Sequence, residues 1–171
     1  MAGFDSGGLG AVLGVLFLGY LLYRQLQVRR LPRQLRLERS MLFVAIGVLT
    51  ALPVLQGRTR VSGAVWAVLV ASFLVGAALA AARAFTVRLW SVDRQLHRQG
   101  TAWTVALWLV AVLTHLAAGF WTHALGGPAA LAGATAMLYL AVASIVQQAV
   151  LVERGNRYRT RARAALGLGQ P

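Results

Sequence analysis

The stretch that decides the fold is residues 99–152, QGTAWTVALWLVAVLTHLAAGFWTHALGGPAALAGATAMLYLAVASIVQQAVLV, which contains no aspartate, glutamate, lysine or arginine. About 20 apolar residues in a helix cross the hydrocarbon core of a bilayer, so this stretch is too long for one crossing and suits two. It is interrupted at residues 126–128, Gly-Gly-Pro, where glycine and proline favour a turn and a new helix start. The sequence therefore predicts two membrane-spanning helices, near residues 101–123 and 128–152.

The rest of the chain contains three more charge-free stretches, residues 6–23, 40–57 and 61–82, each of which fits one crossing. Together they predict an all-α membrane protein, in which a single transmembrane domain of five helices is followed by a basic tail. The predicted spans lie near residues 8–26, 40–56, 61–84, 101–123 and 128–152, and the tail covers residues 153–171. The second span is short and contains Pro53, which is expected to kink the helix or end it early. A re-entrant or interfacial segment is the alternative for this span.

The overall composition agrees with a membrane protein. The 171 residues are 58% hydrophobic and 12% charged, whereas a soluble domain carries about 25% charged residues. A water-soluble chain this apolar would need a core larger than its surface-to-volume ratio allows. Because the chain has no cysteine, disulfides, iron–sulfur clusters and thiolate metal sites are excluded.

The basic charge is distributed unevenly along the chain. The net charge is +13, and all 17 basic residues are arginines. With five spans, 15 of these arginines lie on one side of the membrane, while Arg58 and Arg60 lie on the other. The positive-inside rule then predicts an external N-terminus and a cytoplasmic C-terminus, in a multi-pass protein of the bacterial cytoplasmic membrane. Four or six spans would break this agreement between span count and charge.

Two of the predicted cytoplasmic connections have recognisable patterns. Residues 86–98 alternate in character on both sides of a Ser-Val-Asp sequence, which favours a small cytoplasmic β-hairpin. An amphipathic interfacial helix is the alternative. Thr101 then suits the N-cap position of the fourth span. The first connection mixes leucine and arginine around Pro32, which predicts an extended end of the first helix, a break and a short amphipathic approach to the second.

The arginine clusters are the candidate contacts with lipid or with a membrane-protein partner. Attraction to anionic headgroups is worth about 1 kcal/mol per arginine near the surface. Topology already accounts for most of the charge, so nucleic acid is not an expected partner, and a dedicated site for a phosphate-bearing ligand is the alternative. The candidate contact residues are Arg29, Arg30, Arg33, Arg36, Arg88, Arg94, Arg157, Arg159 and Arg161. Small residues such as Gly10 and Gly14 also favour close helix packing, in a compact bundle or in a homo-oligomer.

The sequence contains no recognisable catalytic constellation, so neither enzyme activity nor a cofactor is expected. The four acidic residues lie outside the predicted spans, and no nucleotide-binding glycine loop, metalloprotease helix motif or nucleophile elbow is present. Thr104, Thr114, His115 and Gln147 are the candidates for a polar path through the third to fifth spans. His115 is also the candidate ligand for haem or a metal, for which the default explanation is a hydrogen-bonded packing histidine.

Two segments carry a resemblance to a known family. One reads YRQL at residues 23–26 and RRL at 29–31; the other reads TVRLW at 86–90, RQGT at 98–101 and LWL at 107–109. On these segments and on its span pattern, the chain resembles the CcdC-like family of small bacterial integral membrane proteins, in the poorly characterised actinobacterial form. The resemblance implies the topology. It implies no thiol-reducing transport, because the chain lacks the cysteine pair that this chemistry needs.

These observations predict a non-enzymatic accessory or scaffold component of the membrane, with a basic cytoplasmic face. One alternative is a small oligomeric carrier or channel that uses the polar path through the third to fifth spans. The other alternative is a haem- or metal-linked membrane protein that uses His115.

Overall fold

The structure is a computed structural model that describes residues 26–31, 38–56, 61–92 and 95–165, together with Gly19, Tyr20, Tyr23 and Gln34. Within these residues the fold is mostly helical. The helices are α2 (Glu38–Gln56), α3 (Gly63–Thr86), α4 (Ala102–Ala124) and α5 (Ala129–Ala165), and the strands are β1 (Arg29–Arg30), β2 (Arg88–Val92) and β3 (Gln95–Gln99). Most of the predicted first span, near residues 8–26, lies outside the described residues.

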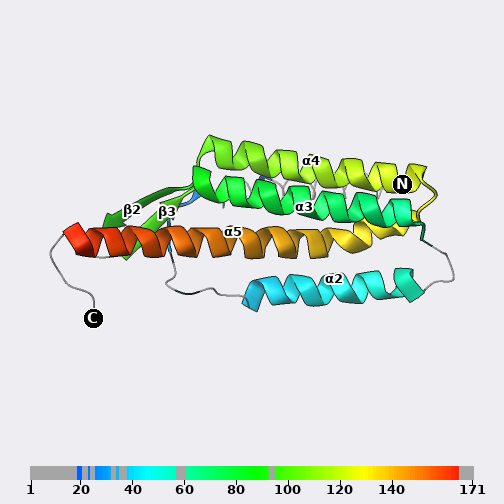
Figure 1. Ribbon diagram of the computed structural model, residues 1–171, viewed down its shortest axis with the longest axis horizontal. Helices are drawn as coiled ribbons and strands as arrows, with labels where there is room; N and C mark the ends of the chain where they lie inside the picture. The colour runs from blue at the N-terminus through cyan, green and yellow to red at the C-terminus, as the bar shows by residue number, and fades with distance from the viewer. Residues whose placement is uncertain are drawn as a thin grey trace, which may run out of the picture.

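Helix α5 lies at the centre of the arrangement (Figure 1). Helices α3 and α4 pack against each other and against α5, and α2 packs against the other side of α5. Three helical segments are long and apolar enough to cross a membrane, namely Gly63–Thr86, Ala102–Ala124 and Gly133–Ala162. They correspond to the third, fourth and fifth predicted spans. The apolar part of α2, Ser40–Pro53, is shorter.

Large apolar side chains cover the outside of these helices. Leu74 of α3 is 67% exposed and Phe120 of α4 is 73% exposed. Of the most apolar stretches of α3 and α4, only 28% and 22% are buried inside the protein. Contiguous apolar surface of this extent is rare on soluble monomers, whereas lipid tails are as apolar as leucine. The helices therefore have the surface of a membrane protein.

Local sequence signals define where α4 begins and ends. The Thr101 hydroxyl accepts a hydrogen bond from Thr104 N at 3.4 Å, and Thr101 N donates to the Thr104 hydroxyl at 3.0 Å. This reciprocal capping box satisfies two backbone donors at the helix start. After the last helical residue of α4, Gly126 takes a φ of 79°, which residues with a Cβ rarely adopt. The predicted N-cap and the predicted turn at residues 126–128 are confirmed.

Pro53 does not end α2 early, because the helix continues to Gln56. That part of the prediction is wrong for a geometric reason: Pro53 lies in the last turn, so few helical hydrogen bonds follow it and only one donor is lost. Helix α2 approaches α5 closely at Gly47, where an added Cβ would lie 2.6 Å from Leu138 Cγ.

Helix α5 is longer than the predicted fifth span. It has no end near residue 152 and continues to Ala165, so the first part of the predicted basic tail belongs to the same helix. Alanine and arginine, which dominate this extension, are strong helix formers. The extension also packs against the sheet, because a Cβ on Gly155 would lie 2.5 Å from Leu31 Cδ2.

The three strands form one antiparallel sheet in the order β1-β3-β2. Strands β2 and β3 are the hairpin predicted near residues 86–98, with Trp90 opposite His97, and the alternative of an interfacial helix is wrong. Strand β1, from the first connection, was not predicted. It pairs with β3 so that Arg29 lies opposite Arg98. A strand of two residues is too short to produce a period-two pattern in the sequence.

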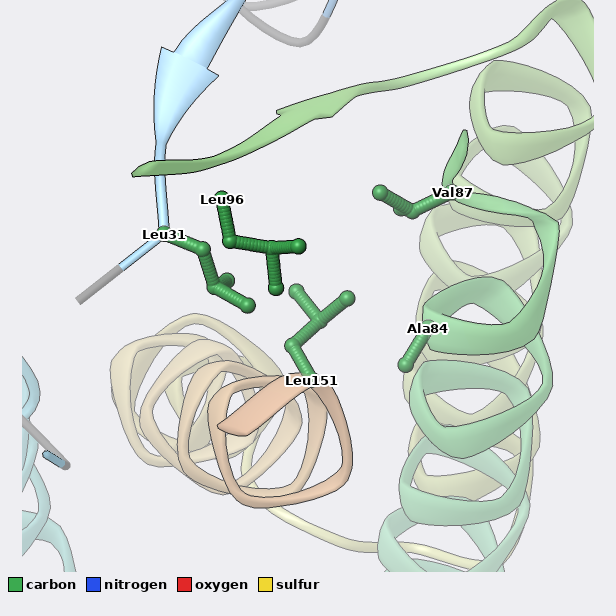
Figure 2. Packing of buried hydrophobic residues seen from close by; sticks show 5 residues of the cluster. All are labelled: Leu31, Ala84, Val87, Leu96 and Leu151. Atoms are coloured by element: carbon green, nitrogen blue, oxygen red, sulfur yellow. The ribbon is translucent and has the colours of Figure 1, made fainter. Parts of the chain in front are cut away.

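A small apolar cluster attaches the sheet to the helices (Figure 2). Leu31 and Leu96 point from the strands toward Leu151 of α5, and Ala84 and Val87 contribute from the end of α3. All five side chains are buried. The cluster fixes the sheet at the end of the bundle where α2 begins, α3 ends and α4 begins, which we call the sheet end (Figure 1).

Candidate functional site

A cavity of about 650 Å³ lies at the sheet end, between the strands and helices α2, α4 and α5. Its volume falls within the range of about 300–1,000 Å³ that is usual for small-molecule sites. The described residues that line it are Gln27, Arg29, Ser40, Leu42, Phe43, Val87, Arg98, Gly100, Thr104, Trp108, Ser144, Gln147 and Gln148. Cationic and polar groups come mainly from the strands and from α5, and the large apolar groups come from α2 and α4.

Hydrogen bonds fix the polar wall of this cavity. The amide of Gln148 donates to the Ser40 hydroxyl at 3.4 Å, which ties α5 to α2. The Thr104 hydroxyl lies 2.8 Å from the Thr86 hydroxyl, which ties α4 to α3. Gln147, which also lines the cavity, accepts a hydrogen bond from an arginine of α3. Hydrogen bonds at this wall therefore connect all four described helices.

Arg83 is the arginine that holds Gln147. It lies near the end of α3, is only 5% exposed, and donates from Nη2 to Gln147 Oε1 at 2.7 Å. Its Nε is buried and has no hydrogen-bond partner among the described residues. The predicted third span, residues 61–84, includes Arg83, but the sequence pattern did not indicate that its side chain is buried and bonded to α5.

Arg29 and Arg98 form the cationic part of the cavity lining. They are directly opposite each other on β1 and β3. Burial, and then the neighbouring positive charge of Arg29, lower the pKa of the Arg98 guanidinium from its usual value. Arg29 Nη2 donates to Gln27 Oε1 at 3.2 Å, a neutral acceptor. Like charges opposite each other destabilise an antiparallel pair, so this juxtaposition is a structural cost.

The other arginines divide into structural and exposed groups. Arg154 donates to the Ala84 and Val87 carbonyls at the end of α3 and lies 5.3 Å from the centre of the Phe85 ring. Arg159 donates to the Leu31 carbonyl at 3.4 Å and so helps to hold β1. The exposed arginines among the predicted contacts are Arg30, Arg88, Arg157 and Arg161. The remaining predicted contacts, Arg33, Arg36 and Arg94, lie outside the described residues.

The candidate polar path is divided between two places. Thr104 and Gln147 meet in the cavity, whereas Thr114 and His115 lie roughly 15 Å farther along α4, at 1.5 Å per residue. The Thr114 hydroxyl donates to the Val110 carbonyl of its own helix at 2.8 Å. This common back-bond leaves little polarity for a ligand.

His115 packs in the centre of the bundle. Its ring is buried and stacks on Tyr139 of α5, with 4.5 Å between the ring centres. The Tyr139 hydroxyl donates to the Ala111 carbonyl at 2.7 Å, and Phe73 meets the same ring edge-on. Within the described ranges there is no group of three or more histidine, cysteine, aspartate or glutamate residues that could hold a metal ion.

No family model, curated protein or solved structure matches this chain. The resemblance to CcdC-like proteins therefore stays a prediction, and the site has to be interpreted from its own chemistry. The cavity offers guanidinium, amide and hydroxyl groups on one side and apolar surface on the other. Such a lining suits binding of a ligand that is itself part anionic and part apolar.

Proposed function

We propose that the protein is a multi-pass component of a bacterial cytoplasmic membrane that acts without catalysis, as an accessory or scaffold protein. Its sheet end lies at the inner headgroup level, where it meets anionic lipid and a membrane-protein partner or a second copy. The long apolar helices and their apolar outer surface support the membrane location. Helix α2 serves as a further span, in a five-span topology with the N-terminus outside.

The observation that carries the proposal is the position of the arginines. Every arginine that the structure describes lies at the sheet end, and none lies at the opposite end among the described residues there (Figure 1). Positive charge in short connections is retained on the cytoplasmic side of the membrane. The arginines concerned are Arg29, Arg30, Arg39, Arg83, Arg88, Arg98, Arg154, Arg157, Arg159, Arg161 and Arg163.

The basic face formed by these arginines at the sheet end is built on secondary structure rather than on irregular loops. The hairpin is attached to α5 through the small apolar cluster around Leu151. The C-terminal part of α5 continues beside the hairpin (Figure 1). Arg30, Arg88 and Arg161 are thus presented from fixed elements rather than from flexible connections. A fixed basic face is what a scaffold at the membrane surface needs, because ordering the face in advance lowers the entropic cost of binding.

The test is purification of the full-length protein from membranes under mild conditions, followed by identification of stoichiometric partners. We expect stable partners or a defined homo-oligomer, which dissociates in the triple variant Arg30→Gln, Arg88→Gln and Arg161→Gln. A protein that purifies alone and turns over a small molecule in liposomes would contradict the proposal.

A small carrier is the second candidate, and the cavity favours it. Thr104 and Gln147, two of the four residues predicted for a polar path, lie together in the cavity lining. In proteoliposomes, a carrier or channel for ions would collapse an imposed membrane potential faster than empty liposomes do, and Gln147→Leu would slow this collapse. Equal decay with and without protein would exclude ion conduction.

A further inference from the structure

The cavity has features that general attraction to a charged surface does not require. Arg29 and Arg98 both line it and lie opposite each other on paired strands. In the part of the chain that the structure describes, no carboxylate lies within ion-pair distance of either guanidinium; the one ion pair there joins the exposed Arg157 and Glu153. An anion between the two guanidinium groups would replace their repulsion with two charge-assisted contacts.

A third positive charge lies behind the cavity wall. Arg83 is buried and bonds through Nη2 to Gln147 Oε1, a neutral acceptor. Because this bond uses the carbonyl oxygen of Gln147, the amide nitrogen remains as a donor in the cavity that Gln147 lines. A buried charge is unfavourable unless an opposite charge compensates it. The two charged residues in the described lining, Arg29 and Arg98, are both cationic, and Arg83 adds a third positive charge behind the wall.

The opposite wall of the cavity is apolar. Leu42 and Phe43 of α2 and Trp108 of α4 contribute to the lining. A free inorganic anion would contact the guanidinium groups and leave these side chains without a partner. An amphiphile with an anionic group at one end uses both walls. Phosphate suits a pair of planar guanidinium groups, because its several oxygens can accept from the N–H donors of both.

We propose that this cavity is a specific binding site for an anionic phospholipid, whose phosphate lies between Arg29 and Arg98 and whose first acyl-chain carbons contact Phe43 and Trp108. The amide of Gln147 supplies a further donor to the phosphate. The lipid is favoured over free phosphate, which shares the anionic chemistry, because the cavity has an apolar wall and lies at the sheet end, which the proposed function places at the headgroups. The inference rests on the proposed function for this position at the membrane surface.

The experiment uses the full-length protein in a mild detergent, titrated with a fluorescent phosphatidylglycerol. Unlabelled phosphatidylglycerol is expected to displace the probe, while phosphatidylcholine and inorganic phosphate at the same concentration are expected to leave it bound. Arg29→Gln and Arg98→Gln are each expected to raise the Kd by about tenfold or more, the effect of losing one charge-assisted contact. Arg157→Gln removes the same charge from an exposed position outside the cavity lining and should change the Kd by less than about twofold.

Three results would refute the proposal of a specific phospholipid site. Displacement by phosphatidylcholine as effective as by phosphatidylglycerol would show that the charge is not recognised. Displacement by inorganic phosphate alone would show a free-anion site. Weakening by Arg157→Gln equal to that by Arg98→Gln would show diffuse attraction. If an arginine variant does not fold, the competition series on the unmodified protein still decides between the first two results and the proposal.

The site and the proposed function fail separately. If the protein has no stable partners but binds phosphatidylglycerol through Arg98, the scaffold function is refuted and the lipid site is supported. If the protein purifies with stoichiometric partners but shows no preference for the anionic lipid, the scaffold function is supported and the lipid site is refuted.

Discussion

Gly76 on α3 is where the helix packing can be tested most sharply. A Cβ at this position would lie 2.6 Å from Tyr139 Cζ and 2.8 Å from the Tyr139 hydroxyl oxygen. The ring has little freedom to move away. It stacks on His115, meets Phe73 edge-on, and donates its hydroxyl to the Ala111 carbonyl. Gly76→Ala should therefore force α3 and α5 apart.

The magnitude follows from these contacts. Overpacking of a tight core costs about 1–3 kcal/mol, and loss of the tyrosine hydrogen bond adds about 1 kcal/mol. The better helix propensity of alanine returns about 0.5–1 kcal/mol. Gly133→Ala on α5 is the matched control, because nothing lies within 4 Å of the added Cβ. The two variants should thus differ in the free energy of unfolding by about 2–4 kcal/mol.

The assay is unfolding of the purified protein in mixed micelles by increasing sodium dodecyl sulfate, followed by circular dichroism. In a Tyr139→Ala background the target of the clash is gone, so Gly76→Ala should become neutral or stabilising there. If Gly76→Ala behaves like Gly133→Ala in the natural background, the close packing of α3 on α5 described above is wrong.

Four further variants test other parts of the structure. Thr101→Ala removes the N-cap of α4 and should lower the free energy of unfolding by about 1 kcal/mol in the same micelle assay. Gly155→Val, whose Cβ would lie 2.5 Å from a leucine of the sheet side, should cost about 1–3 kcal/mol and speed proteolysis of the β2–β3 hairpin. Arg157→Ala should change stability by less than about 0.5 kcal/mol at any salt concentration, because its ion pair with Glu153 has side chains 70% and 58% exposed. His115→Ala should cost more than the about 0.5–1.5 kcal/mol of the lost ring stacking, because it also leaves a cavity at a buried position, and the natural protein should show no Soret band for the substitution to remove.

The long helices were predictable from the sequence because they depend on local signals. Charge-free length locates α3, α4 and most of α5, and the glycine-proline turn separates the last two. The threonine N-cap and the alternating hairpin are also local patterns. These features need no knowledge of which elements touch.

The features that escaped prediction depend on contacts between distant segments. Strand β1 exists because two residues of the first connection pair with β3. The end of α5 was placed too early because arginines in the sequence resemble a tail, although the helix continues where it packs against the sheet.

The candidate site depends on distant contacts as well. Thr104 and Gln147 were singled out for polarity alone, and the cavity brings them together with Arg98. No local pattern distinguishes Arg98 from the other arginines of its cluster. The buried position of Arg83, and its bond to Gln147 64 residues away, likewise have no local signal.

The side of the membrane on which the sheet end lies is the central claim, and single-cysteine labelling tests it most directly. The chain has no cysteine, so Ser91→Cys in β2 and Leu125→Cys at the α4–α5 turn each create one reactive thiol. Both side chains are exposed and lie at opposite ends of the bundle. In intact bacteria treated with a membrane-impermeant maleimide, the Leu125→Cys variant should react, and the Ser91→Cys variant should react only after the membrane is permeabilised. Labelling of Ser91→Cys in intact cells, with Leu125→Cys protected, would contradict the account.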